Sequence, residues 1–406
     1  MNINYNFNDK FDIWFFATII LLLCIGLLAI YSATLNNALV ENNFTKQLFW
    51  VGIGIIVFFI VFSIPTNTFK NIAWPAYLFS ILLLLVVLIM GRKISGAKSW
   101  LFFGSLGFQP SEIAKISTIL ALSSFLCKKD VDIETFKDIL IALAIGVAPI
   151  LLILLEPDMG TVLVFATIFL TIIFWKGISL FGLFVVLSPG IVAVSSLFGT
   201  LPFITTLAVV ALILIFFKKG LIFSGSLFAI NLAAGFFTDF VYHALSPHQQ
   251  IRIKSFLDPM SDPLGSGYNS IQAKVAIGSG GLFGLGLGHS RQKFNYLPEV
   301  ATDSIFAIVA EELGFVFAVI LVLLFLAFTI QALRVAKGAS DRFGQLVAVG
   351  IAVWIGFQAF VNVGAMLSLL PLTGIPLPFI SYGSSSMITL LAAAGLLANI
   401  SRYSKH

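Results

Sequence analysis

Acids, bases and glycines gather in one segment, residues 243–303, of a chain that is otherwise almost wholly apolar. Because only 10% of all residues are charged, a polar loop of this length is where we expect chemistry. Its carboxylates are suited to accept a proton and its cations to hold an anion. Its polar side chains include His248, Gln250, Arg252, Lys254, Asp258, Asp262, Gln272, Lys274, Arg291, Lys293, Glu299 and Asp303.

Two aspartates of this loop are candidate general bases. Asp262 stands in "SDPLGSGY" with Pro263 and Gly265 close by, which predicts a turn that lets a carboxylate project into a cavity. Asp258 also precedes a proline and is close enough in sequence to form a carboxylate pair with Asp262. Spacing alone equally allows Asp262 to cap a turn or a helix, so the residues by themselves leave the two roles open.

Several cations are suited to bind diphosphate oxygens, arginine by bidentate contact and lysine as a point charge. In the loop these are Arg252, Lys254, Lys274, Arg291 and Lys293. Lys115 is more unusual because it lies within an apolar segment, one helical turn after Glu112. Charges inside a membrane are costly and are usually functional or paired, so the alternative is a purely structural ion pair.

Other polar or aromatic positions complete the candidate substrate-binding set. Trp100 offers a ring face to a sugar, or else anchors the chain at the membrane interface. Gln272 and Glu299 are further candidates from the polar loop. Asp303 is close to the start of an expected helix, where acids complement the helix dipole, and is interpreted as a cap. The run "GSGGLFGLGLG" (Gly278 to Gly288) indicates close backbone packing or a re-entrant segment, since no strand-turn-helix unit surrounds it.

Composition predicts an all-α polytopic membrane protein. Hydrophobic residues make up 59% of the chain and mean hydropathy is +1.06, far outside the range of soluble domains. The apolar runs are continuous, which favours helices over barrel strands. We expect ten to twelve transmembrane helices, with one large loop before the last three. The segments are 13–33, 47–64, 73–90, 111–127, 138–156, 160–175, 179–198, 202–217, 221–243, 304–333, 345–370 and 378–400.

Lysine and arginine bias predicts that both termini are cytoplasmic. Short loops then obey the positive-inside rule, and the exceptions fall in residues 91–110 and in the polar loop, which we therefore place outside. Basic residues on that side suggest an anionic ligand there, although long loops can also translocate regardless of charge. Cys24 and Cys127 predict neither a disulfide framework nor a metal site.

The chain resembles the FtsW/RodA family, the SEDS peptidoglycan glycosyltransferases, over nearly its full length. The longest motif is "RIKSFLDPMSDPLGSGYNSIQAKVAIGSGGLFGLGLGHSRQKFNYLPEVATDSIFAIVAEELG" (Arg252 to Gly314). Others are "GAKSW" (Gly96 to Trp100), "QPSEIAK" (Gln109 to Lys115), "EPDMGT" (Glu156 to Thr161) and "NVGAMLSLLPLTGIPLPFISYGSSS" (Asn362 to Ser386). The chain departs from the family at Ser384, Ala301 and Ser304, and has two more helices near 179–243 than the ten usual there.

The resemblance implies a single membrane domain over residues 1–406 of a bacterial cytoplasmic membrane protein. It implies that lipid II is polymerised into glycan strands outside, with inversion and with Asp262 as the catalytic base. A class B penicillin-binding protein and membrane lipid are the implied partners. We expect no nucleic acid and no cofactor, and leave a divalent cation open. The alternatives are a transporter that flips the lipid-linked precursor and a non-catalytic scaffold. Within the family the motifs favour the division branch, FtsW, over the elongation branch, RodA.

Overall fold

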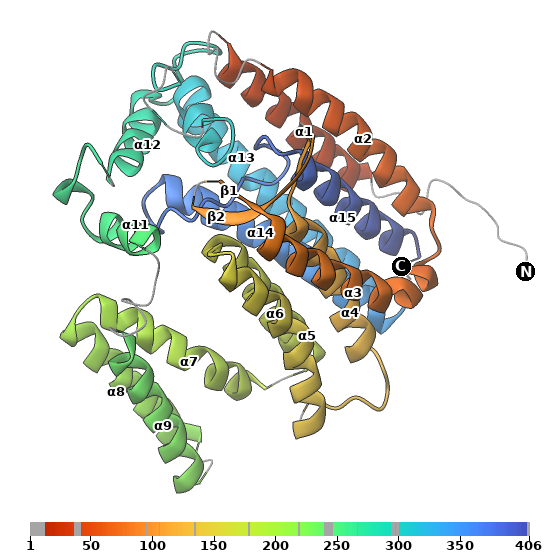
Figure 1. Ribbon diagram of the computed structural model, residues 1–406, viewed down its shortest axis with the longest axis vertical. Coiled ribbons are helices and arrows are strands. Elements are labelled where there is room, and N and C mark those ends of the chain that lie inside the picture. Colours follow the sequence, from red (N-terminus) through yellow and green to blue (C-terminus); the bar gives the residue numbers. More distant parts are fainter. Residues whose placement is uncertain are drawn as a thin grey trace, which may run out of the picture. The chain divides into compact units, whose positions relative to one another are not determined.

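The protein, described from a computed structural model, is almost entirely helical, with a small sheet in its described part (Figure 1). A helix lies at each of the twelve predicted spans, and ten of the described helices are long and apolar enough to cross a membrane. The all-α polytopic class is therefore confirmed. The structure describes residues 13–35, 42–94, 96–104, 106–133, 135–177, 179–217, 220–238, 247–265, 267–293, 297 and 300–403.

The bounds of the helices match long apolar runs, since a span needs about 20 apolar residues. Pro110 begins the fourth span, where its fixed φ and missing N–H suit the first helical position. The helices at the predicted spans are α1 (Ile13–Thr34), α2 (Asn43–Ser63), α3 (Thr66–Met90), α4 (Pro110–Leu126), α5 (Phe136–Leu155), α6 (Met159–Lys176), α7 (Leu180–Leu197), α8 (Thr200–Phe217), α9 (Leu221–Phe236), α13 (Ile305–Gly338), α14 (Arg342–Met366) and α15 (Ser384–Arg402).

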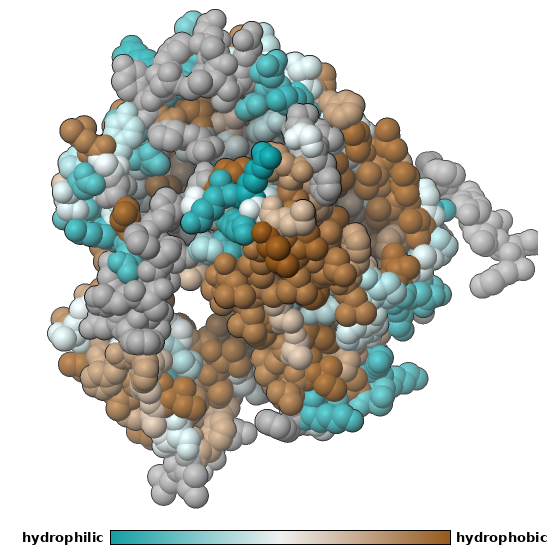
Figure 2. All heavy atoms as spheres, in the orientation of Figure 1, coloured by the Kyte–Doolittle hydropathy of each residue, from teal (hydrophilic) through white to brown (hydrophobic). Residues whose placement is uncertain are grey.

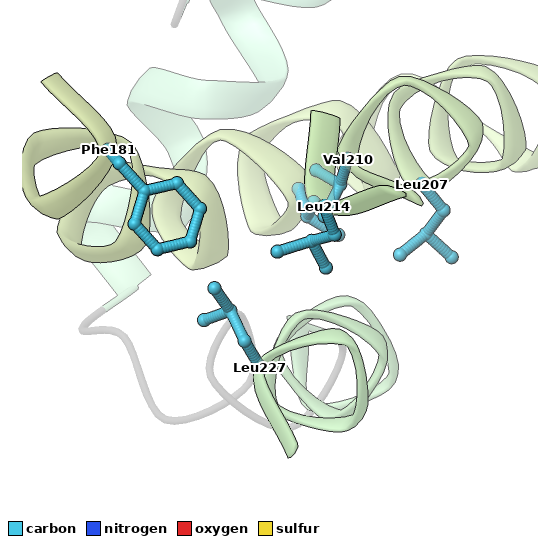
Figure 3. Packing of buried hydrophobic residues seen from close by; sticks show 6 residues of the cluster. Phe181, Leu207, Val210, Leu214 and Leu227 are labelled. Carbon is cyan, nitrogen blue, oxygen red and sulfur yellow. The ribbon is translucent and has the colours of Figure 1, made fainter. Parts of the chain in front are cut away.

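Contacts within the chain divide it into two compact units. Unit 1 comprises Met1–Ile172 and Lys254–His406, and unit 2 comprises Ile173–Ile253. Unit 2 contains α7, α8 and α9, which pack around an apolar core of their own that includes Phe181, Leu214 and Leu227 (Figure 3). The additional helices expected near 179–243 fall in this unit. The prediction of a single functional domain stays a prediction.

Unit 1 is a bundle in which α2 packs against α15, α3 against α4, and α13 against α14 (Figure 1). Its centre is α14, most of whose residues are buried. The outer helices instead present apolar side chains to the surroundings, as a bilayer requires. Figure 2 shows such an apolar surface over α3, with hydrophilic residues gathered around the strands that follow it.

Those strands form a small antiparallel sheet, a feature that hydropathy did not predict. It consists of β1 (Arg92–Ile94), β2 (Ala97–Phe103) and β3 (Leu106–Phe108), in that order. The Lys98 ammonium binds the last carbonyls of α3, those of Leu88 and Ile89, at 2.7 and 3.0 Å. A cation at a helix C-terminus is favourable there because the carbonyls have no helical partner. The sheet is thereby fixed to the end of α3.

Residues 91–110 and the C-terminal end of the polar loop lie at one end of unit 1. The backbone N–H of Lys98 donates to the Glu156 carbonyl at 3.1 Å, and the Ser384 hydroxyl donates to the Gly107 carbonyl at 2.9 Å. These bonds join the sheet to the loop between α5 and α6 and to the start of α15. The N–H of Tyr382 donates to the carbonyl of Ala301, at the end of the polar loop, at 2.8 Å. Residues 91–110 and this end of the polar loop therefore share one side, as the charge bias requires.

Helix α13 is interrupted at Gly314, whose φ of 80° and ψ of 178° are not helical. The break leaves backbone groups on both sides without helical partners, and such groups must be paired inside a membrane protein. The glycine-rich segment 280–288 supplies the partners. Backbone hydrogen bonds join Leu285 to Glu311, Gly286 to Glu312, Phe315 to Gly281 and Val316 to Leu282, at 3.0, 2.9, 2.9 and 3.2 Å.

The glycines are needed because the two backbones lie so close together. A Cβ on Gly280 would lie 2.2 Å from the Ala310 carbonyl oxygen. A Cβ on Gly284, whose φ is +80°, would lie 2.1 Å from the carbonyl oxygen of Glu312. Neither approach leaves room for a side chain, and a positive φ itself favours glycine. The interpretation of the glycine run as close backbone packing is confirmed.

Candidate functional site

Asp262 lies in an exposed turn between a short 3-10 helix, η2 (Pro259–Ser261), and α12 (Tyr268–Ser279). Its carboxylate Oδ1 accepts the N–H of Gly265 at 3.1 Å, and its carbonyl accepts the N–H of Gly267 at 3.0 Å. The predicted turn is confirmed, and the exposed side chain is accessible to a ligand. Catalysis by Asp262 stays a prediction.

The second aspartate has a local structural role. Asp258 caps η2, with its Oδ1 accepting the N–H of Met260 at 3.2 Å. This is the ordinary behaviour of an aspartate before a proline-initiated turn. Both carboxylates are exposed and both bind nearby backbone, so capping alone does not distinguish Asp258 from Asp262.

Glycines keep the Asp262 turn tight. A Cβ on Gly267 would lie 2.0 Å from the carbonyl oxygen of Pro259, which belongs to the backbone and cannot move independently. A Cβ on Gly265 would lie 2.3 Å from the Asp262 Oδ2. The turn therefore requires a residue without a side chain at Gly267, and a side chain at Gly265 would displace the Asp262 carboxylate.

The cations and the amide predicted to bind substrate are spread over α11 (Pro247–Leu257) and α12. Lys254 is exposed on α11, and Gln272 is half-buried on α12. Glu299 and the side chain of Arg252 lie outside what the structure describes. The substrate contacts of all four stay predictions.

Lys293 differs from the other loop cations because its side chain is completely buried. Its ammonium donates to the carbonyls of Gly288 and Ser32, at 2.7 and 3.2 Å, and lies 3.6 Å from a carboxylate oxygen of Glu312. A diphosphate would reach this ammonium only after the loop had rearranged. The structure places Lys293 as an internal partner of Glu312, and its contact with substrate stays a prediction.

Two acids in the second turn of α13 form a buried cluster that the sequence did not predict. Glu311 and Glu312 are 0% and 2% exposed. Both lie just before the break at Gly314, and both accept hydrogen bonds from the polar loop. Two adjacent acids within an apolar run were the signal that a buried site lies here.

Glu112 and Lys115 form the ion pair that their spacing predicts. The Lys115 ammonium lies 2.8 Å from Glu112 Oε1. Its nitrogen also lies 4.8 Å from the centroid of the Trp354 ring, at a distance where a cation and an aromatic face attract. The Thr389 hydroxyl lies 3.2 Å from Glu112 Oε2. The pair thus connects α4 with α14 and α15, and whether it also meets substrate is untested.

Trp100 lies on β2 at the sheet end of unit 1, where its side chain is half-buried. The ring centroid is 6.5 Å from that of Phe102, with the planes tilted. Gly107 on the neighbouring strand leaves space for the indole, since a Cβ there would lie 3.2 Å from Trp100 Cε3. The ring is therefore supported by the sheet, which suits both a sugar platform and an interface anchor.

A further carboxylate at the same end is unusual. Glu156, directly after α5, is 1% exposed, and among the described residues its Oε1 has no hydrogen-bond partner. Burial, together with the nearby charge of Asp158, raises the pKa of Glu156 to about 8. Asp158 instead accepts hydrogen bonds from Thr161, at 3.1 and 2.8 Å, and from the Gln109 amide at 3.3 Å. The "EPDMGT" motif thus holds one carboxyl group that is protonated at neutral pH.

The candidate residues form three centres in unit 1. These are the Asp262 turn, the Glu311–Glu312 cluster that binds the polar loop, and the Glu112–Lys115 pair that connects α4 with α14 and α15. Their carboxylates and cations suit proton transfer and anion binding. Among the described residues, no three His, Cys, Asp or Glu side chains are placed to share a metal ion.

Comparisons with known proteins point to one family. A family model described as a cell cycle protein, FtsW/RodA/SpoVE, matches residues 12–207 and 181–406. Stage V sporulation protein E of Bacillus subtilis (strain 168) is 37% identical over 397 residues, covering 95% of this chain and 96% of the relative. Peptidoglycan glycosyltransferase RodA of Treponema pallidum (strain Nichols) is 35% identical over 426 residues, covering 97% of this chain and 98% of the relative.

A solved structure extends the likeness to three dimensions. Its description concerns a peptidoglycan synthase complex and the structural coordination of polymerization and crosslinking by that complex. The matching chain superposes with a TM-score of 0.72 at 27% identity, covering 97% of this chain and 98% of that one. The fold is therefore shared along nearly the whole length.

Proposed function

The chain belongs to the FtsW/RodA/SpoVE family of cell cycle proteins, and from this premise we propose that it is a peptidoglycan glycosyltransferase that polymerises lipid II. A relative that is 35% identical is named for the glycosyltransferase activity. The observation that carries the proposal is Asp262, an accessible carboxylate held in a glycine-dependent turn of the polar loop.

In the proposed reaction, Asp262 takes the proton from a sugar hydroxyl of the acceptor. The freed oxygen attacks the anomeric carbon of the donor with inversion, and the bond to undecaprenyl pyrophosphate breaks. No covalent intermediate is needed. A base in hydrogen-bond reach of the hydroxyl contributes about 10²- to 10⁴-fold in rate. The departing diphosphate takes the electron pair, so cations that contact it stabilise the transition state.

Lys254 is a ligand of the departing diphosphate in this proposal, because its side chain is exposed on the helix that precedes the Asp262 turn. Lys293 is buried, which leaves its ammonium less accessible. Arg252 is proposed as a second diphosphate ligand on its charge and its bidentate geometry. The reaction needs no cofactor. Polymerisation measured with and without EDTA tests the divalent cation that the sequence leaves open.

The protein is a multi-pass membrane protein, and we propose that its polar loop faces outwards from the cytoplasmic membrane with both termini inside. The charge bias supports this orientation. Residues 91–110 meet the C-terminal end of the polar loop at the same end of unit 1, which supports the orientation too. If both segments face outwards, one orientation explains both exceptions to the positive-inside rule.

We further propose a class B penicillin-binding protein as the partner. The support is the fold shared with a chain from a peptidoglycan synthase complex that couples polymerization and crosslinking. Purification of the tagged chain from its native membrane, followed by labelling with a fluorescent penicillin, should reveal a bound transpeptidase. A preparation free of any penicillin-binding protein would count against this partner. The division branch, FtsW, stays a prediction that complementation of a division defect or an elongation defect would test.

The test of the function is polymerisation of purified lipid II in detergent, where a flippase would produce nothing. Wild-type protein should make glycan strands, and Asp262→Asn should make none while inserting and binding its partner normally. Asp258→Asn is the matched control, since it changes a neighbouring exposed aspartate that caps η2 just before the Asp262 turn. An inactive Asp258→Asn beside an active Asp262→Asn would move the base to Asp258, and activity in both variants would exclude the mechanism. A wild-type protein without polymerase activity would favour the transporter or the scaffold.

A further inference from the structure

Glu311 binds the polar loop at three points. Its carboxylate accepts the hydroxyl of Ser290 in a short hydrogen bond. It also accepts the N–H of Arg291 at 3.1 Å and the hydroxyl of Ser279 at 3.3 Å. Ser279 is the last residue of α12, so Glu311 contacts both the C-terminal end of that helix and the segment that follows the glycines.

Glu312 binds the same loop from a second direction. Its carboxylate accepts the hydroxyl of Ser32, on α1, in a short hydrogen bond and the N–H of Ser290 at 3.2 Å. The Lys293 ammonium, 3.6 Å away, supplies a compensating positive charge. The Ser32 hydroxyl oxygen also accepts the N–H of Gly288 at 3.0 Å. The loop is therefore fixed to α1 and to α13 through buried groups.

The cluster is connected mechanically to Asp262 through α12, which begins shortly after the Asp262 turn and packs against α13 (Figure 1). A helix of 12 residues is about 18 Å long. If the contacts at Ser279 were lost and α12 tilted by about 10°, its N-terminal end, next to the Asp262 turn, would move by about 3 Å. A misplacement of about 1 Å can cost about 10²-fold in rate.

We infer that Glu311 and Glu312 are positioning residues for the glycosyl transfer, which hold α12 and the glycine-rich loop so that Asp262 meets the acceptor hydroxyl. This inference rests on the proposed function. The two carboxylates lie within the folded protein and act through the loop they hold. Burying two acids beside one ammonium is costly, and an apolar cluster would pack at lower cost if the loop needed only to be covered.

The first test compares Glu311→Gln and Glu312→Gln with wild-type protein in the lipid II assay. Each amide keeps the side-chain volume but removes the charge and places N–H donors against existing donors. We expect kcat to fall about 10- to 100-fold with KM changed less than about threefold. The acid limb of the pH profile of kcat/KM should shift, because it reports the environment of the base in the free enzyme. Asp130→Asn, an exposed acid in another loop, should match wild-type protein.

Two further variants separate positioning from folding. Ser279→Ala removes one hydrogen bond at an exposed position, so it should fold normally and lower kcat about three- to tenfold. Glu312→Gln combined with Lys293→Met removes both charges and should be more active than Glu312→Gln alone. Unchanged kcat and an unchanged acid limb in folded Glu311→Gln and Glu312→Gln would overturn the inference.

Hydrogen exchange provides a readout that does not depend on activity. Amides of residues 259–265 and 281–292 should exchange faster in Glu311→Gln and Glu312→Gln, while amides of α14 and α15 stay as protected as in wild-type protein. If wild-type protein makes no glycan, the proposed function fails, and the exchange data still decide whether the carboxylates hold the loop. Exchange identical to wild type would exclude the positioning role in either case.

Discussion

The ammonium of Lys115 lies 2.8 Å from the Glu112 carboxylate, and the two side chains are only 2% and 5% exposed. The pair is surrounded by the Trp354 ring and the Thr389 hydroxyl from two other helices. Bulk water cannot hydrate charges at this depth, so each charge needs a partner within the protein. The pair joins α4 to α14 and α15, so its loss should weaken the packing of all three helices.

Lys115→Met should destabilise the protein by about 3–5 kcal/mol, because it leaves the Glu112 charge buried without its partner. Glu112→Gln should have a similar effect through the unpaired ammonium. The double variant should recover much of the loss, and Lys129→Met, at an exposed position, should change little. Thermal unfolding midpoints in detergent measure this. A double variant as unstable as the sum of the single variants would show that the two residues act independently.

The positions of the membrane helices could be predicted from sequence because each is a long apolar run, and length alone identifies a span. The Glu112–Lys115 pair could be predicted for a similar local reason, since residues three apart share a helix face. The Asp262 turn followed from its proline and glycine neighbours. In all three cases the information lies within a few residues of the feature.

The remaining features depend on contacts between distant parts of the chain. The burial of Lys293 requires carbonyls from Ser32 and Gly288, and the first of these lies on α1. The break at Gly314 requires the glycine-rich loop to supply hydrogen bonds, which hydropathy does not show. The sheet after α3 is short and was not visible as an apolar run. Such features follow from tertiary packing, which overrides local preference.

Stability should depend on pH through Glu156. Its pKa is raised from 4.5 to about 8 by burial and by Asp158, so the folded protein binds this proton more tightly than the unfolded chain. The stabilisation is complete below about pH 4.5 and is lost as pH rises towards 8, by up to about 1.4 kcal/mol per pH unit.

Glu156→Gln tests this dependence because it imitates the neutral carboxyl group at every pH. Unfolding midpoints measured from pH 5 to pH 8 should show a small difference from wild type at pH 5. As pH rises, the midpoint of the variant should exceed that of wild type by a growing margin. Asp130→Asn, an exposed control, should follow the wild-type curve. Parallel curves for Glu156→Gln and wild type would mean that Glu156 is not held neutral.

Gly267→Ala should lower glycan synthesis by at least about tenfold, since its Cβ would meet the Pro259 carbonyl oxygen at 2.0 Å and displace the Asp262 turn. Gly278→Ala is the control, because Gly278 lies in α12, the helix that Gly267 directly precedes, and a carbon added there has no atom within 4 Å. Polymerisation of lipid II by equal amounts of folded protein compares the two. Equal activity in both variants would show that the turn tolerates displacement.

The orientation of the chain can be tested at two exposed positions that the proposed topology puts on opposite sides. Leu264 is 90% exposed in the Asp262 turn, and Ser340 is exposed between α13 and α14. With Cys24 and Cys127 replaced by alanine, Leu264→Cys should react with an impermeant maleimide in intact spheroplasts. Ser340→Cys should react only after lysis, because the loops rich in lysine and arginine stay cytoplasmic. The reverse pattern would place Asp262 on the cytoplasmic side, where it could not polymerise glycan outside the membrane, and the proposed function would fail with the topology.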